Sequence, residues 1–126
     1  MFIEINVSSS QPIYEQLVEQ IKFSIAAEAV RVDEMIPSLR ELSKKLALNP
    51  NTVARAYRTL QDEGVVCFRR GTGLAVAPGA KERCEEDRRK WFENRLQQLL
   101  ADAVKSRLDS DEVKKIVEST FKQKFQ

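Results

Sequence analysis

The sequence predicts a mainly α-helical chain with one small β-hairpin, and three features of its pattern lead to this fold class. Apolar residues recur at helical spacing through residues 12–64 and alternate with period two through residues 65–77. From residue 80 onward the helical spacing returns in a heavily charged stretch. We therefore expect three helices, a hairpin and a tail of two further helices.

The first elements follow from the apolar pattern. Ile3, Ile5 and Val7 alternate with polar residues, which predicts a short strand-like start. A helix follows Pro12 and frays near Ala29. Its apolar face consists of Ile13, Leu17, Ile21 and Ile25.

The second and third helices are predicted to be joined by a tight turn. Ser38 is suited to cap the second helix, whose inward residues are Leu39, Leu42 and Leu46. The break at 47–48 leads into the third helix, with Asn49 at its N-cap and Pro50 in its first turn. Gly64 ends this helix.

The third helix has two chemically different faces at 100° per residue. Its core face consists of Val53, Ala56, Tyr57 and Leu60, and its opposite face carries Asn51, Arg55, Arg58 and Asp62. After Gly64, Val66 and Phe68 alternate with Val65, Cys67 and Arg69, and the chain turns at residues 70–73 and returns through residues 74–77. This predicts a hairpin with a basic, glycine-containing tip.

Pro78-Gly79 reads as a linker, so we expect one domain at residues 1–78 and a second at residues 79–126. The second domain begins as a long helix over 80–108, followed by a helix that 109–112 can cap. Two helices of this size bury little apolar surface in each other, so we expect them to need a partner. The apolar residues that we expect to hold two subunits together are Trp91, Leu96, Leu99, Leu100, Val113, Ile116 and Phe121.

Composition excludes several function classes. The chain has no histidine, which removes the commonest general acid–base group, and it shows no phosphate loop or nucleophile elbow. Its two cysteines make a poor zinc site, and we expect them to be idle thiols in a reducing compartment. We therefore predict no enzyme, no metal and no cofactor. No signal peptide or membrane span is apparent, so we expect a cytoplasmic protein.

Charge is distributed unevenly although the net charge is only +2. Residues 40–72 hold seven Lys and Arg against three Asp and Glu, whereas residues 1–39 hold two against six. A basic block of this kind is typical of a nucleic-acid surface, although a solvated charged face explains it as well.

Three helices followed by a hairpin, with the second and third helices joined tightly, is the order of a winged helix-turn-helix. In that motif the second helix of the pair enters the major groove of DNA. The polar residues Asn51, Thr52, Arg55 and Arg58 are then available to DNA, and asparagine and arginine pair well with adenine and guanine. Arg69 and Arg70 at the hairpin tip suit a phosphate or minor-groove contact. A protein-interaction module and an RNA-binding module remain open as alternatives.

The motifs I-P-S-L-R-E-L-S-K-K-L, N-P-N-T-V-A-R-A-Y-R-T-L, D-E-G-V-V and R-R-G-T-G together resemble the GntR family of bacterial transcription regulators, and its YtrA-like subfamily in particular. The resemblance covers residues 10–77 closely. It implies a homodimer that binds an inverted-repeat operator in double-stranded DNA, usually as a repressor. The DNA contacts that the resemblance carries over are Arg40, Asn49, Asn51, Thr52, Arg55, Arg70, Gly71 and Thr72.

The sequence departs from this family in a few places. Ala54 stands where many members carry arginine, which puts one DNA contact in doubt. Glu28, Asp33 and Ala47 replace family glycines, and Ala47 is strained if the turn needs a positive φ. We expect the tail to have no evident pocket for a small-molecule effector, and Trp91 to be an interface anchor.

Overall fold

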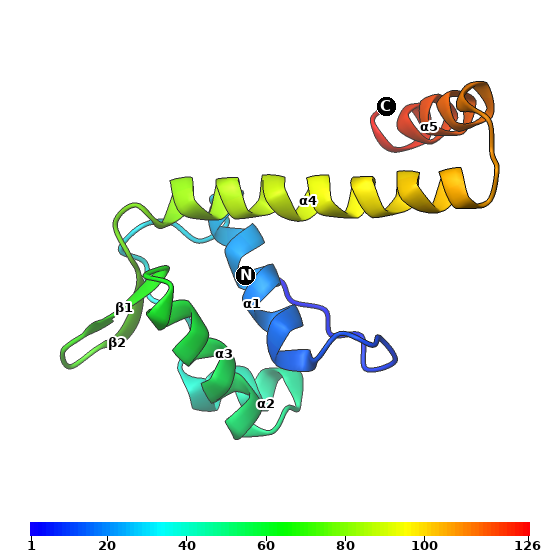
Figure 1. The fold of residues 1–126 in the computed structure, drawn as a ribbon. Helices are drawn as coiled ribbons and strands as arrows, with labels where there is room; N and C mark the ends of the chain where they lie inside the picture. Colours follow the sequence, from blue (N-terminus) through cyan, green and yellow to red (C-terminus); the bar gives the residue numbers. More distant parts are fainter. The chain divides into compact units, whose positions relative to one another are not determined.

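The computed structural model describes residues 1–126 and confirms the predicted fold class (Figure 1). The elements in chain order are α1 (Ile13–Ala26), α2 (Leu39–Leu46), α3 (Pro50–Asp62), β1 (Val66–Arg69), β2 (Gly73–Val76), α4 (Ala80–Lys105) and α5 (Ser110–Lys124). The two strands form one antiparallel sheet. The chain divides into two compact units, Met1–Arg88 and Arg89–Gln126.

The core of the N-terminal unit lies between α1, α2, α3 and the hairpin. The apolar faces predicted for the first and third helices are confirmed, because Leu17, Ile21, Val53 and Leu60 are each fully buried. Each such side chain contributes about 1.5–3 kcal/mol relative to leaving it in water. This core fixes the rotation of α3 about its axis, and so decides which of its residues face solvent.

The caps predicted for the second and third helices are confirmed. The Ser38 hydroxyl accepts a hydrogen bond from the Glu41 amide at 3.1 Å, and the Glu41 carboxylate accepts one from the Ser38 amide at 3.1 Å. The Ser38 amide and hydroxyl thereby lower the pKa of Glu41. At the start of α3 the Asn49 side-chain oxygen accepts a hydrogen bond from the Asn51 amide at 2.9 Å. Each cap satisfies an amide that would otherwise lack a partner.

The turn between α2 and α3 requires a left-handed residue, and Ala47 occupies it with a φ of 52°. A left-handed conformation costs an L-residue with a Cβ about 1–2 kcal/mol. Glu28 and Asp33 also have positive φ values, 58° and 70°. Three non-glycine residues of this unit therefore take the left-handed conformation.

The hairpin has a third, shorter neighbour that the sequence did not indicate. β1 and β2 pair with Val66 opposite Val76 and Arg69 opposite Gly73. Along the other side of β2, the Asp33 amide donates to the Val76 carbonyl at 2.9 Å and the Ile36 amide to the Leu74 carbonyl at 2.9 Å. Residues 33–36 thus tie the base of the hairpin to the start of α2.

The strand predicted for the first residues is wrong, because no other strand lies beside them. Two glutamine side chains of α1 supply the hydrogen bonds instead. Gln16, only 5% exposed, accepts from the Asn6 amide at 2.9 Å and donates to the Asn6 carbonyl at 3.0 Å. Gln20 makes the same pair of bonds with Glu4. The extended segment that precedes α1 in the chain therefore runs alongside this helix without belonging to a sheet.

The N-terminal unit extends ten residues beyond Pro78, the boundary predicted from the sequence. Ala80 is 1% exposed and Cys84 is fully buried, so the first turns of α4 complete the core. Burial raises the pKa of the Cys84 thiol to about 11, which keeps it protonated. Cys67 is half-buried, and both cysteines are free thiols.

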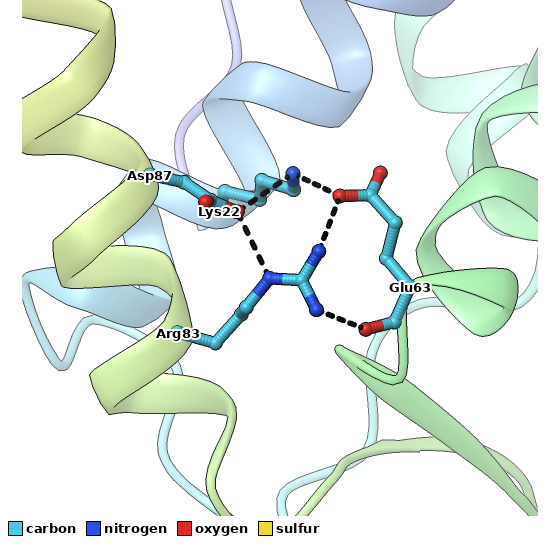
Figure 2. A network of polar contacts seen from close by, with 4 residues as sticks. All are labelled: Lys22, Glu63, Arg83 and Asp87. Carbon is cyan, nitrogen blue, oxygen red and sulfur yellow. Dashed lines mark hydrogen bonds and ion pairs between the residues drawn. The ribbon is translucent and has the colours of Figure 1, made fainter.

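A network of four charged side chains joins the first turns of α4 to α1 and to the end of α3 (Figure 2). Lys22 Nζ lies 2.5 Å from Glu63 Oε1 and 3.1 Å from Asp87 Oδ2. Arg83 Nε donates to the Asp87 carboxylate at 3.3 Å, and its Nη1 donates to the Glu63 carbonyl at 3.0 Å. Burial alone would lower the pKa of Lys22, but the hydrogen bonds to the two carboxylates outweigh it and raise that pKa.

The C-terminal unit contains the rest of α4 and all of α5. α4 ends at Lys105, three residues before the predicted end, and Arg107 takes a left-handed φ of 62°. Asp109 caps α5 as predicted, because its carboxylate accepts a hydrogen bond from the Glu112 amide at 2.9 Å. None of the helices combines the length and apolar character needed to cross a membrane.

Candidate nucleic-acid interface

The polar face predicted for the third helix is exposed on α3. Asn51, Arg55 and Arg58 are exposed, and Thr52 is half-buried beside them. The opposite face is held by the core, and by the Tyr57 hydroxyl, which donates to the Pro37 carbonyl at 2.7 Å. Burial raises the pKa of Tyr57, so this hydroxyl stays a donor. α3 therefore presents a fixed row of amide and guanidinium donors to solvent.

On one side of this row, α3 borders the start of α1. The guanidinium carbon of Arg55 lies 3.7 Å from the centroid of the Tyr14 ring, which is a stacked cation–π contact. A recess of about 420 Å³ is lined by Ile13, Tyr14, Asn51, Thr52 and Arg55. Tyr14 could not be identified from the sequence, because the contact joins residues that are far apart in the chain.

On the other side, α3 borders the hairpin. A groove of about 470 Å³ lies between the start of α2, α3 and the two strands. Its lining includes Ala54, Arg58, Gln61 and Phe68, and Phe68 is 67% exposed. Phe68 shares its strand face with Val66, but it lies beyond the edge of the core, so alternation alone could not decide its burial. Gln61 and Phe68 were missed as candidate residues.

The hairpin of β1 and β2 is the wing of the winged helix-turn-helix. Its two arginines, Arg69 and Arg70, differ in their surroundings. An Arg69 guanidinium nitrogen lies 2.5 Å from the Asp33 carboxylate, whereas Arg70 at the tip has no such partner. Thr72 donates to the Arg69 carbonyl through both its amide and its hydroxyl, which closes the turn. Gly71 has a φ of 79° and open space around its α-carbon. The exposed backbone of residues 70–72 is thus accessible to a large ligand.

α2 adds further positive charge to the same unit. Arg40, Lys44 and Lys45 are all exposed. Lys44 and Lys45 lie in the last turn of α2 and were not singled out from the sequence as contact residues. The side-chain oxygen of Asn49 accepts the capping hydrogen bond of α3, so only the side-chain nitrogen of Asn49 remains to donate to a ligand.

The C-terminal unit presents an apolar face. None of residues 89–126 is buried, and the residues predicted for dimerisation are half-buried (Trp91, Val113) or exposed (Leu96, Leu99, Leu100, Ile116, Phe121). The Arg95 guanidinium lies 4.3 Å from the centroid of the Trp91 ring. α4 and α5 border an open apolar groove of about 820 Å³, lined in part by Leu100, Val113 and Phe121, where the sequence predicted no pocket.

Comparison with known proteins gives one consistent family. Residues 13–76 match the model of the bacterial regulatory proteins of the gntR family. The chain is 37% identical over 101 residues to the HTH-type transcriptional repressor YtrA of Bacillus subtilis (strain 168), covering 80% of this chain and 78% of that protein.

Two solved structures extend this comparison. A transcriptional regulator from Oenococcus oeni is similar at a TM-score of 0.74 and 28% identity, over 95% of this chain and 99% of that one. The DNA-binding domain of AraR, solved in complex with an operator, is similar at a TM-score of 0.54 and 25% identity, over 61% of this chain and 96% of that one. The chain therefore belongs to the GntR family of bacterial regulatory proteins and is a DNA-binding transcription regulator.

Proposed function

We propose that the chain represses transcription by binding, as a homodimer, an operator of two inverted half-sites in double-stranded DNA. One observation carries this proposal. The exposed row of Asn51, Arg55 and Arg58 lies on a helix whose opposite face is fully buried, beside a basic hairpin. A fixed helix with amide and guanidinium donors on its outer face fits the major groove, where base edges carry a readable pattern.

The residues of this face take different roles in the proposal. Asn51 and Arg55, in the first turns of α3, read base edges, because asparagine suits adenine and arginine suits guanine. Thr52 and Arg58 bind sugar and phosphate oxygens at the margins of the same face. Arg40 and Asn49 bind the sugar-phosphate backbone of the DNA beside the helix-turn-helix.

The wing makes a second contact with the same half-site. Arg69, Arg70, Gly71 and Thr72 approach a phosphate or the minor groove, where the glycine lets the backbone come close. Because Asp33 already binds Arg69, Arg70 is the stronger contact of the two. The comparison with the operator complex of AraR supports DNA as the ligand of this unit.

The dimer is supported by the apolar face of the C-terminal unit. Ile116 is 55% exposed, Leu99 is 66% exposed and Phe121 is 60% exposed, on a two-helix unit with no buried residue of its own. Such a unit is not stable alone in water, and a second copy of the same face covers it. In this proposal the second copy occupies the open groove between α4 and α5, so the groove is not an effector site. The protein acts in the cytoplasm, where the operator lies, and needs no cofactor or catalytic activity.

The experiment that tests this function is selection of duplexes from a randomised DNA library by the full-length chain. We expect the selected duplexes to share an inverted repeat, and sedimentation to give a dimer that Ile116→Glu converts to a monomer. Lys115→Gln on the same helix is the matched control, because Lys115 does not line the groove, and it leaves the dimer intact. Recovery of no shared sequence, or stronger binding to structured RNA than to the selected duplex, contradicts the proposal.

A further inference from the structure

We propose that Tyr14 is a positioning residue for base recognition, holding the guanidinium of Arg55 by one face so that its N–H edge is ready for a base. This inference rests on the proposed DNA-binding function and names a residue of α1 that lies outside the helix-turn-helix. The observation that carries it is the 3.7 Å separation between the Arg55 guanidinium carbon and the centroid of the Tyr14 ring.

The Tyr14 ring is itself held in place. Tyr14 is half-buried and packs against the hydrophobic core, and its hydroxyl donates to the Glu15 carboxylate at 3.2 Å. An arginine side chain in solution samples many rotamers, and ordering it on binding costs affinity. A fixed ring beneath the guanidinium removes part of that cost before DNA arrives.

Stacking does not compete with base recognition. The five N–H donors of a guanidinium lie in its plane. Because the Arg55 guanidinium carbon is only 3.7 Å from the ring centroid, there is no space for an N–H edge to point at the ring, and the ring contacts the face. A bidentate contact with the O6 and N7 atoms of guanine uses the edge of the guanidinium. Arg55 can therefore keep its contact with Tyr14 while it donates to a base.

The surroundings of Arg55 favour this role over a purely structural one. Tyr14 and Arg55 line the same recess as Asn51 and Thr52, the other donors in the first turns of α3. Arg69 of the wing is paired with the Asp33 carboxylate, whereas Arg55 forms no ion pair and rests on a neutral ring. A neutral ring orients the charge without neutralising it, and so leaves it available to DNA.

The test is a double-mutant cycle in the full-length chain, with Tyr14→Leu, Arg55→Ala and both together. The probes are a duplex selected by the wild-type chain from a randomised library and a scrambled duplex of the same composition. We expect Tyr14→Leu to weaken binding to the selected duplex about two- to fivefold, which is the effect of an exposed cation–π contact. Binding to the scrambled duplex stays unchanged. In the Arg55→Ala background, Tyr14→Leu has no further effect.

Tyr14→Phe is the matched control, because it keeps the ring and removes only the hydroxyl; it should bind like the wild type. An equal loss from Tyr14→Leu with and without Arg55 overturns the inference, and so does a loss from Tyr14→Phe as large as that from Tyr14→Leu. A folding defect would appear in both backgrounds, so the cycle separates it. If Arg55→Ala weakens binding while Tyr14→Leu does not, the positioning role fails and the proposed function stands. If no duplex is selected, both fail.

Discussion

Cutting the chain after Pro78 removes part of the core of the N-terminal unit, although Pro78-Gly79 looks like a linker in the sequence. The cut deletes Ala80 and Cys84, which are 1% and 0% exposed, and with them Arg83 and Asp87 of the charged network. A cut after Arg88 keeps all four. The two fragments therefore test where the unit ends.

The loss can be worked from these contacts. The side chains of Ala80 and Cys84 amount to about three methylene-sized groups, worth ~0.8 kcal/mol each. The ion pair between Lys22 and Asp87, whose side chains are 13% and 27% exposed, adds about 1 kcal/mol. We expect the shorter fragment to be less stable by about 3 kcal/mol, a large part of the ~4–13 kcal/mol typical of a unit of this size.

Urea unfolding of the two fragments measures this difference. With a slope of about 1–3 kcal/mol per molar for small proteins, the midpoint of the shorter fragment should lie about 1–3 M below that of the longer one. In the full-length chain, Cys84→Ser should destabilise more than Cys67→Ser, because only Cys84 is fully buried. Equal midpoints for the two fragments would refute the reasoning and restore a boundary at Pro78.

Three further predictions concern the turn, the wing and acid stability. Ala47→Gly should stabilise the chain by about 0.5–1 kcal/mol in urea unfolding, because relief of the left-handed strain exceeds the added entropy of the unfolded glycine; a destabilised variant contradicts this. Arg70→Ala should reduce the slope of log K against log salt by about one, and Arg69→Ala by less, because Asp33 already binds Arg69; equal slopes would show that the pair with Asp33 is irrelevant. Burial alone would raise the pKa of Asp87, but the hydrogen bond from Lys22 outweighs burial and lowers this pKa below its ordinary value of 3.8. The Asp87 carboxylate therefore contributes stability above that ordinary value. This stability is lost as the pH falls through the folded pKa. Asp87→Asn should therefore be less stable than the wild type near neutral pH and lose less stability below about pH 4; identical acid profiles would contradict this.

Local features of the fold could be predicted from the sequence because their causes are local. The Ser38 and Asn49 caps need only residues two or three positions away, and both are present in the structure. The two faces of α3 follow from helical periodicity alone. The basic tip of the hairpin was predicted in the same way, from Gly71 and its neighbours.

Features that join distant segments could not be predicted. The first residues alternate between apolar and polar like a strand, yet their backbone hydrogen bonds go to the side chains of Gln16 and Gln20 on α1. Ala80 and Cys84 form a short buried face at the start of α4. The many charged residues around them in the sequence make this face difficult to recognise. The stacking of Arg55 on Tyr14 depends on the packing of α1 against α3, and no local pattern encodes it.

The central claim is that two copies of α3 read one operator together, and half-site spacing tests it most directly. The affinity of the full-length chain is measured for two duplexes. One is the selected inverted repeat, and the other is the same repeat with about five base pairs, roughly half a helical turn, inserted between the half-sites. Linking two modules raises avidity by ~10²–10⁴ when the spacing fits, so the insertion should cost most of that gain. A full-length chain that binds both spacings equally well would contradict the account.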